Sequence, residues 1–114
     1  MSQNFLRQPE RRYHHRIEAE VDVRLLNVDG QEIAATASNI SSGGMYLPVF
    51  HQAIKKDSEL EMVVHIPDQD RPIKIFGEVR RVDDSSQQGL AIKFKGLYND
   101  NILAIDRFIK TKVH

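Results

Sequence analysis

Three arginines lie close together near the start of the chain. The segment that holds them reads Arg11-Arg12-Tyr13-His14-His15-Arg16. In an extended chain Arg12 and Arg16 lie on the same side, about 13 Å apart, and a bend brings them closer. A guanidinium grips a phosphate or a guanine edge with two hydrogen bonds, and it stacks flat on a purine. Taken alone, the cluster is explained more simply by a solvated basic run at a chain end.

A second polar segment follows about two dozen residues later. It reads Asn39-Ile40-Ser41-Ser42-Gly43-Gly44. Asn39 and Ser41 are short polar side chains on the same side of an expected strand end. Gly43 and Gly44 allow backbone N–H groups to turn toward a ligand, as they do in anion-binding nests. Taken alone, this segment is also compatible with an ordinary polar turn.

The order and spacing of the two segments resemble the signature of the PilZ domain family. That signature is Arg-x-x-x-Arg followed by (Asp/Asn)-x-Ser-x-x-Gly. It is matched here by Arg12 and Arg16 and then by Asn39, Ser41 and Gly44. The resemblance continues in two later stretches and covers about residues 10–96. These stretches are Phe76-Gly77-Glu78-Val79 and Gly89-Leu90-Ala91-Ile92-Lys93-Phe94.

The resemblance implies binding of cyclic di-GMP, a bacterial second messenger made of two guanylates joined in a ring. Arg12 and Arg16 then meet guanine edges and phosphates. Asn39 and Ser41 hydrogen-bond a guanine on the barrel surface, and Gly44 lets the backbone approach. An arginine that reads a guanine edge is a strong and specific contact, worth about 1–3 kcal/mol.

Three further residues refine this expectation. Asn39 stands where many family members carry Asp, so binding is expected to survive in a weakened form. Gly43 is assigned to the ligand site together with Gly44. Arg11, directly before Arg12, is associated in the family with capture of a stacked pair of cyclic di-GMP molecules, so we expect two ligands per chain.

The elements that must position these residues are mostly short strands. Residues 20–27 alternate between apolar and polar types, which is typical of a half-buried strand. Asp29-Gly30 predicts a hairpin turn. Further strands are predicted at residues 31–40, 45–47, 60–66, 73–82 and 89–94, and Gly77 suggests a bulge or bend in its strand.

After residue 99 the apolar spacing changes to that of one helix face. The prediction is therefore a mainly β fold: a small six-stranded antiparallel barrel with a C-terminal helix. Residues 1–16 are polar and are predicted to be a flexible basic arm, and residues 17–114 to be the barrel with its helix.

Composition excludes several classes of protein. The 114 residues suit one domain, and 16 Lys and Arg balance 16 Asp and Glu, so no global charge attracts DNA or an anionic membrane. The chain has no Cys. No apolar run approaches the ~20 residues of a membrane span, and residues 1–7 lack a signal-peptide core. We expect a soluble, cytoplasmic protein that contacts no membrane.

Catalysis and metal binding are not expected, and no cofactor is predicted. The five histidines are adjacent or scattered, which does not suit a metal site. The Asp83-Asp84 pair is attributed to turn chemistry. Ser41 has no evident base and no nucleophile elbow around it.

Two alternatives to a cyclic di-GMP receptor stay open. One is a small-barrel protein that binds RNA or single-stranded DNA through the basic arm, although aromatics make up only 7% of the chain and Phe76, Phe94 and Phe108 are expected in the core. The other is a PilZ fold that binds only a protein. If the chain is a receptor, a single domain must pass its signal to a downstream protein, which the sequence does not identify.

Overall fold

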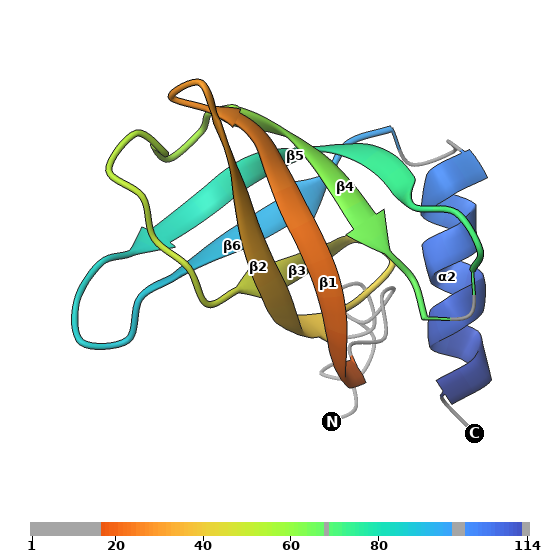
Figure 1. Cartoon of the computed structure of the whole chain (residues 1–114). Coiled ribbons are helices and arrows are strands. Elements are labelled where there is room, and N and C mark those ends of the chain that lie inside the picture. The colour runs from red at the N-terminus through yellow and green to blue at the C-terminus, as the bar shows by residue number, and fades with distance from the viewer. Residues whose placement is uncertain (1–16, 68, 97–99, 113–114) are drawn as a thin grey trace, which may run out of the picture.

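The computed structural model describes residues 17–67, 69–96 and 100–112. The strands form a closed antiparallel barrel in the order β1-β2-β3-β6-β5-β4 (Figure 1). A single helix follows them among the described residues, and this confirms the expected fold class. The expected arm, residues 1–16, lies outside the described residues. The elements are β1 (Ile17–Val28), β2 (Gln31–Ile40), β3 (Gly44–Leu47), β4 (Glu59–His65), β5 (Ile73–Asp83), β6 (Gly89–Phe94) and α2 (Asp100–Lys112).

A tight hairpin joins β1 and β2, and the register of the two strands shifts by one residue between Leu25 and Val28. Val28 pairs with Gln31, which leaves Asp29 and Gly30 as a two-residue turn. Both turn residues have positive φ, 53° and 79°. A turn of this kind matches the right-handed twist of the flanking strands. The expected hairpin is therefore confirmed.

Strand boundaries follow the alternation of side chains closely. β2 and β6 have the predicted bounds. The other strands differ from prediction by one residue at one or both ends, except that β1 begins three residues earlier, at Ile17. The early start matters because it brings the chain that follows Arg16 into the sheet. Ile17 pairs there with Ile40, at the far end of β2.

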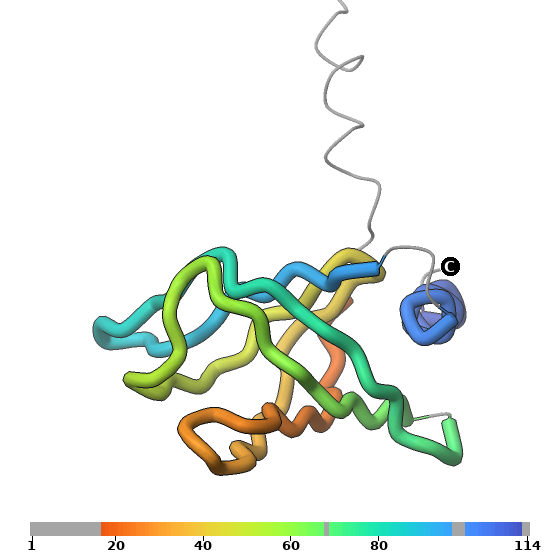
Figure 2. The backbone as a smooth tube through the Cα atoms, turned by 90° about the horizontal axis from the view of Figure 1, so that it is seen from above, coloured from red at the N-terminus to blue at the C-terminus, as the bar shows by residue number. Residues whose placement is uncertain are grey.

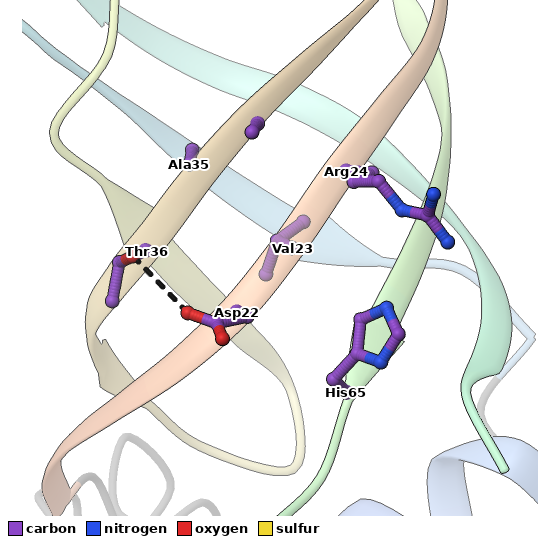
Figure 3. A pocket seen from close by; sticks show the side chains of 7 residues that line it. Asp22, Val23, Arg24, Ala35, Thr36 and His65 are labelled. Atoms are coloured by element: carbon purple, nitrogen blue, oxygen red, sulfur yellow. Dashed lines mark hydrogen bonds between the residues drawn. The ribbon is translucent and has the colours of Figure 1, made fainter.

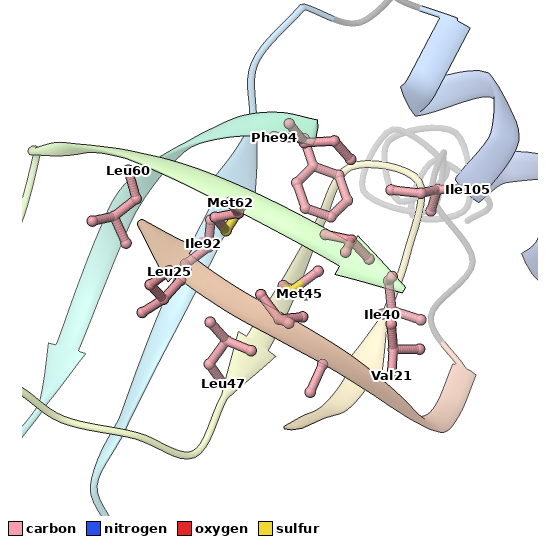
Figure 4. Packing of buried hydrophobic residues seen from close by; sticks show 14 of the residues in the cluster. Val21, Leu25, Ile40, Met45, Leu47, Leu60, Met62, Ile92, Phe94 and Ile105 are labelled. Carbon is pink, nitrogen blue, oxygen red and sulfur yellow. The ribbon is translucent and has the colours of Figure 1, made fainter. Parts of the chain in front are cut away.

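The barrel interior is filled by aliphatic side chains and one phenylalanine. Figure 4 shows Leu25, Met45, Met62 and Ile92 meeting inside the barrel with Phe94 above them, and all five are buried. These residues come from four strands, β1, β3, β4 and β6. Buried residues of β2 and β5, among them Ile40 and Val79, belong to the same core cluster, so all six strands contribute to it. Burial of this apolar surface is the main force that closes the sheet.

One expectation about β5 is wrong, and one of the two alternatives given for Gly77 is excluded. Phe76 is 48% exposed rather than in the core, because Ile75 and Gly77 on either side of it face inward. Gly77 marks no bulge: a Cβ there would lie 2.5 Å from Ile92 Cγ2, so glycine is required by close packing inside the barrel. The irregularity in register lies instead between Val79 and Arg81.

Helix α2 lies beside the barrel, and Figure 2 looks along its axis. Its buried face carries Ile102, Ile105, Phe108 and Ile109, which join the core cluster. Asn101 Nδ2 donates a hydrogen bond to the Lys74 carbonyl of β5 at 2.7 Å. No helix in the described part of the chain has the length and apolar character to cross a membrane.

Candidate functional site

The polar segment Asn39 to Gly44 forms the junction between β2 and β3. Asn39 and Ile40 end β2, and they pair with Tyr46 and Met45 of β3. Asn39 is half-buried and Ile40 is buried, so the side chain of Asn39 lies toward the outer face. The junction therefore presents one amide side chain at the barrel surface, directly before a tight turn.

Ser41 organises this turn from inside. Its side chain and backbone are buried, with 2% exposure. Ser41 Oγ accepts hydrogen bonds from the N–H groups of Gly43, at 3.2 Å, and Gly44, at 3.1 Å. Its own N–H donates to the Gly44 carbonyl at 2.8 Å. The two glycine N–H groups that were expected to turn toward a ligand are thus held by Ser41, because a serine hydroxyl offers the nearest acceptor.

The turn is also fastened to the neighbouring strand. The Gly43 carbonyl accepts a hydrogen bond from Phe94 N at 2.8 Å. At Gly44 a Cβ would lie 2.1 Å from the Ile92 carbonyl oxygen of β6. Gly44 is therefore required by the close approach of β3 to β6, whatever it does for a ligand. Both contacts keep the turn in one conformation.

The basic segment joins the barrel at this same end. Arg11, Arg12 and Arg16 lie outside the described residues. Ile17 follows Arg16 directly and pairs with Ile40, and Glu18 pairs with Asn39. The structure thus brings the point of attachment of the arginines next to Asn39 and Ser41, which are 22 and more residues away in sequence.

A group of polar side chains beside Asn39 was missed by the sequence reasoning. Tyr46, which pairs with Asn39, donates a hydrogen bond from its hydroxyl to Asp83 Oδ2 at 2.9 Å. Arg81 donates to the same carboxylate from Nε, at 3.0 Å, and from Nη2, at 3.2 Å. Its guanidinium carbon lies 5.9 Å from the centre of the Tyr46 ring. Asp83 was expected in a turn, but it is the last residue of β5.

These contacts shift the ionisation of all three groups. The hydrogen bonds from Arg81 and then from Tyr46 lower the pKa of the Asp83 carboxyl. Burial, followed by the hydrogen bond to Asp83, raises the pKa of the Tyr46 phenol. The same carboxylate raises the pKa of Arg81. At neutral pH the cluster therefore consists of a neutral phenol, a carboxylate and a guanidinium.

A separate groove lies on the outer face of β1, β2 and β4. It has a volume of about 430 Å³ and is lined by Asp22, Arg24, Thr36 and His65, among others (Figure 3). Thr36 Oγ1 donates to Asp22 Oδ1 at 3.2 Å. The groove contains none of the residues predicted to bind a ligand. Within residues 17–67, 69–96 and 100–112, no three His, Asp or Glu side chains gather as a metal site.

Solved structures with the same fold were found by comparison. MotI/DgrA of Bacillus subtilis, an inhibitor of motility, has a TM-score of 0.73 and 21% identity over 90% of this chain and 51% of that chain. The PilZ domain of YcgR from Escherichia coli, solved with c-di-GMP, has a TM-score of 0.69 and 14% identity over 89% of this chain and 90% of that chain. The MrkH–c-di-GMP complex of K. pneumonia has a TM-score of 0.71 and 17% identity, over 88% and 51%.

These likenesses establish a shared fold. The chain spans about half the length of MotI/DgrA and of MrkH, so it corresponds to one part of each. Among curated proteins no significant match was found. The sequence itself matches the PilZ domain over residues 10–111, a range that contains both the arginine segment and the turn. The chain therefore belongs to the PilZ domain family.

Proposed function

We propose that this chain is a receptor for cyclic di-GMP. The observation that carries the proposal is the meeting of the two motif halves: Ile17, the residue after Arg16, pairs with Ile40, the residue before Ser41. Arginines anchored there have access to a ligand that lies on Asn39. Structures of the same fold, from YcgR and MrkH, are described as holding c-di-GMP, which supports the same ligand for this chain.

The roles of the individual residues form part of this proposal. Arg12 and Arg16 grip phosphates and guanine edges, because a guanidinium matches both in geometry and charge. Asn39 hydrogen-bonds a guanine at the barrel surface. Ser41 acts chiefly by holding the turn in shape, since its hydroxyl is engaged with Gly43 and Gly44. A turn held in advance costs little entropy to bind, so the cost of ordering falls on the arm.

The proposed output is a change in the arm rather than a reaction. Residues 1–16 become ordered on the ligand, and the ordered arm, with its nucleotide, forms a surface for a downstream protein. We place this adaptor in the cytoplasm, where a bacterial second messenger acts. Hydrogen exchange along residues 1–16 should slow when nucleotide is added, and unchanged exchange at saturation would contradict an ordering arm.

A nucleic-acid ligand is the alternative that the test must include. Phe76 is exposed on β5, as a base-stacking residue would be. Its lysine neighbour Lys74 is paired with Glu61, and Lys95 donates to Glu59 at 2.7 Å, so the surface around Phe76 has no net positive charge to track a phosphate backbone. The described surface therefore favours the cyclic dinucleotide.

Calorimetric titration tests the proposal directly. Cyclic di-GMP, cyclic di-AMP and a short single-stranded oligonucleotide are each added to the full chain at one salt concentration. Saturable binding of cyclic di-GMP alone is expected, because the contacts are made to guanine edges as well as to phosphates. Saturable binding of the oligonucleotide with none of cyclic di-GMP would replace this function with the alternative.

A further inference from the structure

An irregularity in β5 determines where Arg81 lies. Val79 pairs with Ile92, but Arg81, two residues further, pairs with Ala91, so β5 carries one extra residue at this point. Without it the alternation that buries Val79 would also turn residue 81 inward. With it, Arg80 and Arg81 are both exposed and Val82 packs on the core. Bulges of this kind occur near binding sites, where they re-aim a side chain.

Arg81 lies in the same row of paired residues as Asn39 of the proposed ligand site. Asn39 pairs with Tyr46, Tyr46 pairs with Ala91, and Ala91 pairs with Arg81. These residues form one row across β2, β3, β6 and β5. Neighbouring strands are about 5 Å apart, so the whole row spans about 15 Å. Asn39 and Arg81 are thus the two ends of a single strip of barrel surface.

Within this row, the residue between Tyr46 and Arg81 has a small side chain. Ala91 has no side chain beyond Cβ, so Arg81 passes over it to reach the ring of Tyr46, 5.9 Å from the guanidinium carbon. On the same strand Gly89 also lacks a side chain, and a Cβ there would lie 2.0 Å from the Tyr46 hydroxyl. Because Gly89 and Ala91 are small, the side chains of Tyr46 and Arg81 can lie flat over β6.

Two hydrogen bonds to Asp83 hold the Arg81 side chain, which is nevertheless exposed to solvent. Asp83 accepts from Nε and Nη2, and the Tyr46 hydroxyl fixes Asp83 at 2.9 Å. The Arg81 side chain is 62% exposed. Ion pairs this exposed contribute little to stability. An oriented, exposed guanidinium is instead the form in which arginine loses least freedom when it grips an anion.

We propose that Arg81 is a further nucleotide-binding residue of this chain, and that Asp83 and Tyr46 are positioning residues that hold it over the row leading to Asn39. The inference rests on the proposed function and deepens it. The nucleotide lies along the row, and Arg81 meets a phosphate or a guanine edge at the end away from Asn39. Arg81 Nη1 makes neither of the two hydrogen bonds to Asp83, so it is the nitrogen that donates to the nucleotide in this proposal.

The neighbouring arginine provides a matched control. Arg80 is one residue away, is equally exposed and is also paired with a carboxylate, Glu78 at 3.2 Å. It is not in the row. Removing either arginine changes the net charge of the protein by the same amount, so any difference between the two variants reports position and not charge.

The experiment compares Arg81→Ala, Arg81→Lys and Arg80→Ala by calorimetric titration with cyclic di-GMP, and each variant's stability is measured by urea unfolding. Arg81→Ala is expected to raise Kd about 10- to 100-fold, the range of one charged hydrogen-bonding contact. Arg81→Lys keeps the charge but not the fork and is expected to give a smaller rise. Arg80→Ala is expected to leave Kd within about threefold of the wild type.

The positioning role of Asp83 has its own readout. Asp83→Asn should raise Kd in the wild-type background and have no further effect in the Arg81→Ala background, since Asp83 acts through Arg81. A structural role alone would give the same effect in both. Wild-type Kd in Arg81→Ala, or equal losses in Arg81→Ala and Arg80→Ala, would overturn the inference while leaving the receptor function in place. A wild-type chain that binds no cyclic di-GMP would overturn both.

Discussion

Ile17 pairs with Ile40 across β1 and β2. This pairing joins the end of the arginine segment to the beginning of the Ser41 turn, and it makes Arg16 the arginine nearest to the proposed site along the chain. We expect Arg16→Ala to raise the Kd for cyclic di-GMP at least 10-fold, because a charged hydrogen bond is lost. Arg24→Ala, on β1 and paired with Glu32 on the outer face, is the control and should bind as the wild type does. Equal affinity of Arg16→Ala and the wild type would show that Arg16 is not a ligand residue.

Ser41→Ala should destabilise the fold. The change leaves the N–H groups of Gly43 and Gly44 without their acceptor in a buried turn. An unsatisfied buried donor costs about 1–3 kcal/mol, so the free energy of unfolding in urea should fall by that amount. Ser38→Ala, at an exposed position of β2, should change it by less than about 0.5 kcal/mol. Equal stability of the two variants would mean that the serine hydroxyl is not required by the turn.

Gly44→Ala should destabilise the protein whether or not nucleotide is present. The added Cβ would meet the Ile92 carbonyl oxygen at 2.1 Å, and a backbone atom cannot move aside as a flexible side chain can. We expect a loss of about 3 kcal/mol or more in the free energy of unfolding, at the upper end of the range for overpacked sites. Unchanged stability together with lost binding would instead assign Gly44 to ligand approach alone.

The phenol of Tyr46 should titrate above the ordinary tyrosine value of about 10. Burial and the bond to Asp83 raise its pKa, so the stability that it contributes is fully present below pH 10 and is lost as the pH rises through its folded pKa. Absorbance titration should show this late step, and Tyr46→Phe should remove it. In Asp83→Asn the step should move to lower pH, because the hydrogen bond to a carboxylate is gone. A step at the same pH in the wild type and in Asp83→Asn would show that Asp83 does not influence the pKa of Tyr46.

Arg11 should determine how many nucleotides are bound. A stacked pair of cyclic di-GMP molecules carries four phosphate charges, and a third guanidinium beside Arg12 and Arg16 offsets their repulsion. Titration at protein concentrations well above Kd should reach equivalence near two ligands per wild-type chain and near one for Arg11→Leu. An equivalence point of one for the wild type would refute the stacked pair.

Much of the barrel could be predicted because its strands are half-buried and alternate. β2 and β6 were predicted to the residue, since Asp29-Gly30 fixes the start of one and Gly89 the start of the other. Phe76 was placed in the core because it is large and apolar. Alternation with Ile75 and Gly77 decides its side of the sheet instead, and that pattern was already present in the sequence.

The cluster around Arg81 could not be predicted in the same way. Arg81 and Asp83 are two residues apart on one strand, which is a signal that they share a face. Their partner Tyr46 is found only when the order β3-β6-β5 is known, because strands distant in sequence become neighbours. The extra residue between Val79 and Arg81 involves neither glycine nor proline, and its trace in the sequence is the pair of arginines that interrupts the alternation between Val79 and Val82.

The packing of Gly44 against Ile92, and of Ser41 within its own turn, changes how sequences related to this one should be read. Both residues are required by the barrel itself, so a descendant that had stopped binding the nucleotide would still be under selection to keep them. Arg11 and Arg12 lie outside the described residues, and the role proposed for them is contact with the nucleotide. We therefore expect loss of the ligand to be recorded first in the arginines, and a chain that retains the serine and glycine alone should not be counted as a receptor.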